Sequence, residues 1–273
     1  MIIEGHAHIT DIPEPVWSWP PYPGDRLVRE MDGPYPIAGR QRRIDKAVVM
    51  PALGATTLAD WDFYKQHRHV IESVKKYPDR LIGNMVINPR FGVQKGVEVL
   101  RDLVKNHGFR MVKLHPTMHH YWPNKSIHLV APIVEEAIAL NIPVLIHTGE
   151  PPYSVPSLMA PIAESFPKAK IILAHMGTQK VCYADEVIYL ARKNDNIYLE
   201  TGWGVQPRLI EAVSELGASK LTFGTDVPPL EMYSQLRVVE ILTWAPPLGV
   251  NLNEKDLEAI MGDNLAQLMG LER

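Results

Sequence analysis

The sequence contains only one cysteine, Cys182, among its 273 residues. A single cysteine excludes an internal disulfide framework and fits a reducing compartment. No segment approaches the roughly 18 consecutive apolar residues of a membrane-spanning helix. The first residues also lack the basic and apolar segments of a signal peptide. These absences predict a cytoplasmic protein that does not act in a membrane.

An excess of charge of one sign is missing as well. The chain has 28 basic and 31 acidic side chains, which gives a net charge of −3. Because the basic residues are scattered, no electrostatic footprint for nucleic acid is present. The Gly-x-Ser-x-Gly motif of serine hydrolases and the glycine-rich dinucleotide fingerprint are both absent. The sequence therefore gives no indication of a nucleic-acid partner or of a serine hydrolase.

The strongest regularity in the sequence is an alternation of short apolar runs with helix-length amphipathic stretches. The apolar runs are rich in Val, Ile and Leu, as buried parallel strands tend to be. The expected strands are residues 2–8, 44–50, 80–87, 109–115, 142–147, 170–175, 196–201 and 220–226. The expected helices are residues 60–76, 93–106, 129–140, 157–166, 180–193, 206–216 and 254–269, the last with Asn253 as its N-cap.

Eight strands that alternate with helices predict an α/β protein, a (β/α)₈ TIM barrel formed by residues 1–273 as one domain. An open, doubly wound sheet is the rival architecture, and the missing dinucleotide fingerprint argues against it. The first crossover, residues 10–43, is long and rich in proline and tryptophan, with little helical periodicity. We expect it to be a lid or an oligomer contact. Its apolar residues and those near Trp244 could form a homodimer contact or cover the site within one chain.

Histidine and aspartate side chains lie at the ends of four expected strands. His6 and His8 end the first strand, His147 the fifth, His175 the sixth and Asp226 the eighth. The carboxyl ends of barrel strands meet at one face, where barrel enzymes place their catalytic groups. A lone buried histidine is more often a hydrogen-bonded core residue, but four such strand ends favour a metal site. Imidazole and carboxylate ligands suit zinc, manganese or iron.

The sequence resembles the amidohydrolase superfamily, and more closely its amidohydrolase-2 branch, which includes aminocarboxymuconate semialdehyde decarboxylase-like metal-dependent hydrolases. The resemblance spans nearly the whole chain and departs from the family at Glu4, where Asp is usual. It rests on Glu4-Gly-His6-Ala-His8, Val-Lys113-Leu-His115-Pro, Ile-His147-Thr-Gly, Leu-Ala-His175-Met-Gly, Phe-Gly-Thr-Asp226-Val-Pro and Asp263-Asn264-Leu-Ala.

The resemblance implies roles for these residues. His6, His8, His147 and Asp226 correspond to the family's metal ligands, and His175 corresponds to a residue that assists catalysis. A divalent metal lowers the pKa of bound water toward about 7, so Asp226 is expected to accept the proton of an attacking water. We expect zinc as the metal, with manganese or iron possible, and one ion in preference to two.

Several further residues are candidate substrate contacts. Lys113 and His115 lie on one face of the fourth strand, and Lys113 either belongs to a two-metal version of the site or pairs with a carboxylate such as Glu200. Arg90 follows the third strand and could bind a substrate carboxylate or form a surface ion pair. The last candidates, Tyr153 and Trp203, are expected pocket walls or packing residues. The helical histidines His67, His69 and His107 are expected at the surface or in grooves.

The expected activity is that of a metal-dependent hydrolase acting on an amide, lactone or ester bond of a small substrate. The same ligands would serve a non-oxidative decarboxylase of a small carboxylated substrate, which is the first alternative. A barrel that binds metal without catalysis is the second. The sequence does not identify the substrate, because specificity lies in the strand-to-helix loops.

Overall fold

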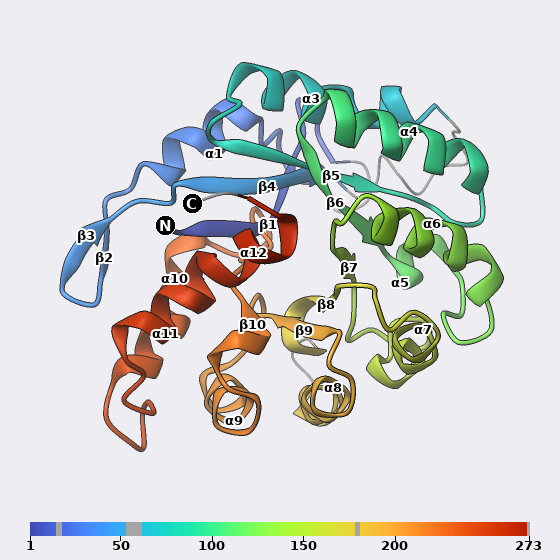
Figure 1. The fold of residues 1–273 in the computed structure, drawn as a ribbon. Coiled ribbons are helices and arrows are strands. Elements are labelled where there is room, and N and C mark those ends of the chain that lie inside the picture. The colour runs from blue at the N-terminus through green and yellow to red at the C-terminus, as the bar shows by residue number, and fades with distance from the viewer. Residues whose placement is uncertain (15–17, 53–61, 178–180, 272–273) are drawn as a thin grey trace.

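The computed structural model describes residues 1–14, 18–52, 62–177 and 181–271. Eight parallel strands form one sheet in the order β1-β4-β5-β6-β7-β8-β9-β10, and helices surround them (Figure 1). The strands are β1 (Ile3–Ile9), β4 (Lys46–Pro51), β5 (Leu81–Val86), β6 (Phe109–Leu114), β7 (Val144–Ile146), β8 (Ile171–Leu173), β9 (Ile197–Glu200) and β10 (Leu221–Thr222). The prediction of a single-domain TIM barrel is confirmed.

The barrel closes between its first and last strands. The backbone N–H of Gly5 donates to the carbonyl of Phe223 at 3.1 Å, and that of His8 donates to Val227 at 2.8 Å. The Glu4 carboxyl adds a side-chain link across this seam, because Oε1 accepts the N–H groups of His6 at 2.7 Å and Thr225 at 2.9 Å. Burial raises the pKa of Glu4 to about 8. The seam therefore lies directly beside His6 and His8.

The helices lie outside the strands and give the barrel a two-layer core. One apolar cluster joins strands to the outer helices, and a second contains alternate strand residues such as Val48, Ile82 and Met111 together with the last helix. The main outer helices are α3 (Phe63–Lys76), α4 (Val93–Asn106), α6 (Ile127–Ala139), α7 (Ala160–Ser165), α8 (Val181–Lys193) and α9 (Gln206–Leu216). The first residues of the expected helices 60–76 and 180–193 lie outside the described residues.

The long first crossover contains more structure than its sequence suggests. It forms α1 (Gly24–Met31) and an antiparallel hairpin of β2 (Tyr35–Ile37) and β3 (Arg40–Arg42). The expectation of little helix there was wrong. A further helix that the sequence did not predict, α10 (Met232–Glu240), follows the last strand.

The expected final helix 254–269 is interrupted. It begins as α11 (Glu254–Glu258), passes through a π-helical segment at Ala259–Asp263 and ends as α12 (Asn264–Met269). The carbonyl of Ile260 accepts the N–H of Phe223 at 2.9 Å, so that oxygen takes part in a bond outside the helix. The Asn253 cap is confirmed, because its side chain accepts the N–H of Asp256.

The expectation that His67 lies at the surface or in a groove was wrong. Its side chain is fully buried, with Nδ1 donating to the Phe63 carbonyl at 2.8 Å and Nε2 accepting the Val86 N–H at 2.9 Å. Among the described residues, no helix combines the length and hydropathy that crossing a membrane requires.

Candidate metal centre

The candidate site residues gather at the carboxyl ends of the strands. His6 and His8 lie within β1, while His147 follows β7 by one residue. His175 lies two residues beyond β8, and Asp226 lies four residues beyond β10. All five are buried. The strand ends therefore converge as the barrel topology predicts.

Three ligand atoms face one another at the seam. Asp226 Oδ1 lies 3.2 Å from His8 Nε2 and 3.4 Å from His6 Nε2. His8 Nδ1 donates to the carbonyl of Pro51 at 3.0 Å, which leaves the Nε2 lone pair directed at Asp226. Because His6 Nδ1 faces the Glu200 carboxylate, its Nε2 is the unprotonated nitrogen as well. Two imidazole lone pairs and a carboxylate oxygen that point together form a donor set that fits a divalent cation.

The electrostatics of the site agree with a neutral His6 imidazole beside an ionised Asp226 carboxylate. Burial lowers the pKa of His6 to about 4, so its ring is neutral at neutral pH. Burial acts to raise the pKa of Asp226, but the neighbouring His6, His175 and His8 outweigh it and hold that pKa well below its usual range. Neutral histidine and ionised aspartate are the forms that bind metals.

Lys113 lies against the same group. Its Nζ lies 3.2 Å from His6 Nε2, and burial lowers the pKa of Lys113 to about 8. A cation held by His6 would compete with the lysine for this lone pair. The structure therefore places Lys113 at the centre of the site, beside His6.

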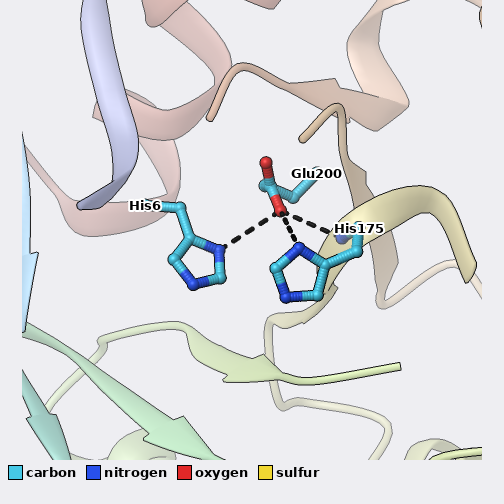
Figure 2. A group of neighbouring side chains, drawn as sticks. All are labelled: His6, His175 and Glu200. Atoms are coloured by element: carbon cyan, nitrogen blue, oxygen red, sulfur yellow. Dashed lines mark hydrogen bonds and ion pairs between the residues drawn. The ribbon is translucent and has the colours of Figure 1, made fainter. Parts of the chain in front are cut away.

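Glu200, at the end of β9, is a site residue that sequence reasoning considered only as a partner for Lys113. Its Oε2 lies 3.3 Å from His6 Nδ1 and 3.8 Å from His175 Nδ1, and it accepts the backbone N–H of His175 at 3.0 Å (Figure 2). Glu200 could have been predicted from its position at the end of an expected strand, because the same criterion selected His147 and Asp226.

His147 is turned differently from the other predicted ligands. Its Nε2 lies 3.3 Å from Glu150 Oε2, and its ring stacks on His115 with centroids 3.7 Å apart. The group of ligand atoms within 4.8 Å of one another contains His6, His8 and Asp226, without His147. The ring of His147 nevertheless lies 4.7 Å from that of His175, at the same mouth. Its role as a ligand stays a prediction.

His175 occupies a strained position at the centre of the ring of histidines. Its backbone is left-handed, with φ 69° and ψ 15°, a conformation that is costly for a residue with a side chain. Its imidazole lies 4.7 Å from that of His6, and its Nδ1 lies 3.9 Å from Asp226 Oδ2. Backbone strain of this kind concentrates at functional sites.

The substrate-contact candidates separate into inner and outer residues. Trp203 reaches the site itself, because its indole N–H donates to Asp226 Oδ2 at 2.6 Å. His115 is buried, and its Nδ1 accepts the N–H of Met118 at 3.2 Å. At the rim, Tyr153 packs against Trp122 with centroids 5.0 Å apart.

Arg90 lies farther out than its sequence position suggested. It is exposed and donates to the carbonyl of His120 at 3.3 Å, and its guanidinium lies 5.9 Å from the centre of the Phe91 ring. This arrangement fixes Arg90 at the rim of the barrel. The described contacts do not bring it to the metal-ligand group.

Comparison with models of known protein families gives one match. The family model described as amidohydrolase matches residues 3–271. A search of curated proteins found no match.

Solved structures with the same fold include two decarboxylases with bound manganese. A dihydroxybenzoic acid decarboxylase from Polaromonas sp. JS666, with the inhibitor 2-nitroresorcinol, has a TM-score of 0.69 and 21% identity, covering 100% of this chain and 97% of that chain. A 5-carboxyvanillate decarboxylase from Novosphingobium aromaticivorans, with 4-hydroxy-3-methoxy-5-nitrobenzoic acid, has a TM-score of 0.71 and 13% identity, covering 99% and 96%.

One hydrolase is similar to the chain to the same degree. A protein from Acinetobacter baumannii, described as a probable 2-pyrone-4,6-dicarboxylic acid hydrolase with citric acid bound, has a TM-score of 0.68 and 15% identity, covering 99% of each chain. At these identities the structural likeness establishes the fold.

Proposed function

Because the chain belongs to the amidohydrolase family, we propose that it is a metal-dependent, non-oxidative decarboxylase of a small aromatic or conjugated carboxylic acid. The choice of a decarboxylase rests on the contacts made by the two carboxylate oxygens of Asp226. Its Oδ2 accepts the Trp203 indole N–H at 2.6 Å, and its Oδ1 faces His6 and His8. With one oxygen held by the indole N–H and the other directed with the two histidine lone pairs at an ion, this carboxylate is a good ligand and a poor acceptor for the proton of an attacking water.

The structural relatives support the same choice. Both manganese-containing relatives described above are named as decarboxylases of hydroxylated aromatic acids. The hydrolase first expected from the sequence has weaker support than its decarboxylase alternative.

We propose that His6, His8 and Asp226 hold one divalent ion, with His147 as the fourth ligand after it turns from Glu150. Manganese and zinc both suit these ligands. When bound, the ion supplies positive charge that holds the carboxylate and stabilises negative charge on the substrate. Tyr153 and Trp203 would then flank the substrate ring, and the single cysteine favours a cytoplasmic location.

The protein's own part in the reaction is delivery of a proton. The bond between the substrate carbon and its carboxyl group breaks, the electron pair stays on the carbon, one proton replaces the carboxyl group and CO₂ leaves. We assign the proton to the protonated imidazole of His175, which lies between the rings of His6 and His147. Burial lowers the pKa of this ring well below its usual value, so the protonated form gives up its proton readily. The inner histidines and Lys113 are buried, so bulk water does not compete with this donor.

Hydrolysis of a lactone is the second candidate, favoured by the equal similarity to the pyrone hydrolase. The experiment compares manganese-loaded protein on 2,6-dihydroxybenzoate, 5-carboxyvanillate and 2-pyrone-4,6-dicarboxylate, with released CO₂ and ring opening as separate readouts. We expect CO₂ from a carboxylated aromatic acid. The variant Asp226→Asn should lose that activity, while the exposed control Asp195→Asn should keep it. Ring opening without CO₂ release would establish the hydrolase instead.

A further inference from the structure

The turn that follows β9 reaches two sides of the candidate metal centre. Glu200 at its start contacts His6, and Trp203 three residues later contacts Asp226. We propose that this turn is a positioning element, in which Glu200 orients His6 and Trp203 orients Asp226 toward a single ion. The proposal rests on the metal site of the proposed function and assigns it two residues that do not touch the ion themselves.

Glu200 is placed to fix the orientation of the His6 ring. Its Oε2 lies 3.3 Å from His6 Nδ1, and both side chains are almost fully buried. A carboxylate that accepts the Nδ1 proton keeps Nε2 unprotonated and directs it at the metal, which increases the basicity of the ligand. In Figure 2 the His6 and His175 rings both face this carboxylate.

The same carboxylate could be mistaken for part of a second metal site. His6, His175 and Glu200 have ligand atoms within 4.8 Å of one another. However, Glu200 already accepts the backbone N–H of His175 at 3.0 Å and that of Gly202 at 2.5 Å. These N–H groups direct their positive ends at the oxygens, where a cation would have to displace them. The cluster is therefore a hydrogen-bonded support for the ligands.

The packing around Glu200 prevents it from moving away. A Cβ on Gly202 or on Gly224 would lie 2.5 Å from Glu200 Oε1, so only glycine leaves room for the carboxylate at these two positions. The Glu200 side chain is thus enclosed by backbone from the turn after β9 and from the segment after β10. An enclosed carboxylate holds a constant geometry toward His6.

Trp203 fixes the other ligand. Its backbone is left-handed, with φ 59°, and this conformation accompanies the approach of its indole to Asp226. The N–H donates to Oδ2 at 2.6 Å, which leaves Oδ1 toward His6 and His8 at 3.4 and 3.2 Å. The indole therefore selects which oxygen of Asp226 faces the ion.

The test is calorimetric titration of Mn²⁺ into the chelator-treated full chain. The variants are Glu200→Gln and Trp203→Phe. Matched controls are Glu240→Gln, another buried carboxylate that accepts a backbone N–H, from Ala38 at 2.8 Å, and Trp122→Phe, a tryptophan of the same barrel face. We expect one Mn²⁺ per wild-type chain. Each test variant should bind it about 10–100-fold more weakly, and the controls should bind it as the wild type does.

The thermal midpoint of the metal-free protein separates positioning from folding. Weaker Mn²⁺ binding with an unchanged thermal midpoint of the metal-free protein supports the proposal. If Glu200→Gln fails to fold, the proposal is tested with Trp203→Phe alone. Unchanged affinity in both folded variants would overturn it. Two ions in the wild type and one in Glu200→Gln would make Glu200 a ligand of a second ion. Because only metal binding is measured, these results stand apart from whether CO₂ is released, while a wild type that binds no Mn²⁺ contradicts both proposals.

Discussion

His67 links helix α3 to strand β5 through both nitrogens of its ring. One nitrogen donates to the Phe63 carbonyl and the other accepts the Val86 N–H, so only the neutral ring satisfies both bonds. Burial lowers the pKa of His67 to about 4, well below the value of about 6.5 for an exposed histidine. The neutral form is therefore built into the fold.

This shift predicts a dependence of stability on pH. Because the folded pKa is depressed, the unfolded chain binds the proton more readily, and stability is lost as pH falls from about 6.5 through about 4. The loss due to His67 approaches about 3 kcal/mol at the acid end. We expect His67→Gln, which cannot take up the proton, to lack this part of the slope.

The measurement is the free energy of unfolding in urea, taken from pH 4 to pH 7 on metal-free wild type and variant. Subtracting the two curves removes the contribution of the other buried histidines. Parallel curves across this range would show that His67 is not the residue that titrates.

At the scale of single residues, the sequence predicted some of the candidate site residues and missed others. His6, His8 and Asp226 were selected by their strand-end positions, and the structure brings them together. Glu200 was considered only as a partner for Lys113, because nothing in the sequence indicates that its carboxylate contacts the His6 ring. The burial of His67 was missed because its partners are backbone groups, which leave no pattern in side-chain types.

At the scale of elements, the strands were predicted well because each is buried on both faces and therefore reads as an apolar run. The helices α1 and α10 were missed for a different reason. The N-cap residue of α1 is Pro23, whose side chain makes no capping bond, and that of α10 is Glu231, an uncommon cap. Neither helix start carries the usual sequence signal.

Two helix starts give a matched comparison of capping. The Asn253 side chain accepts the N–H of Asp256 at the start of α11, whereas Ser126 at the start of α6 makes no side-chain capping bond. We expect Asn253→Ala to lower the free energy of unfolding by about 1 kcal/mol and Ser126→Ala to change it by less than about 0.5 kcal/mol. Chemical denaturation of both variants checks this, and equal losses would contradict the assignment of the caps.

At the scale of the whole molecule, the candidate ligands join opposite ends of the chain. A metal bound by β1 and by the segment after β10 should stabilise the closed barrel, because it binds the folded state alone. At 100 times its dissociation constant, Mn²⁺ should add about 2.7 kcal/mol. The thermal midpoint should then rise by roughly 5–10 °C.

Thermal unfolding with and without Mn²⁺ measures this rise, and a chelator should reverse it. His8→Ala should abolish it, since the variant keeps the barrel and loses a ligand. An equal rise in His8→Ala would indicate that the ion binds elsewhere.

The seam between β1 and β10 also determines at what stage of chain synthesis the candidate metal site can form. His6 and His8 precede Asp226 along the chain, and they also precede Val227, whose carbonyl accepts the His8 N–H across the seam. Until Asp226 is added, a nascent chain therefore carries these two histidines with no carboxylate at this position to complete the site. If His6, His8 and Asp226 hold an ion as proposed, a chain that stops before Asp226 would not retain it, so metal retention would distinguish chains that contain this residue from truncated ones.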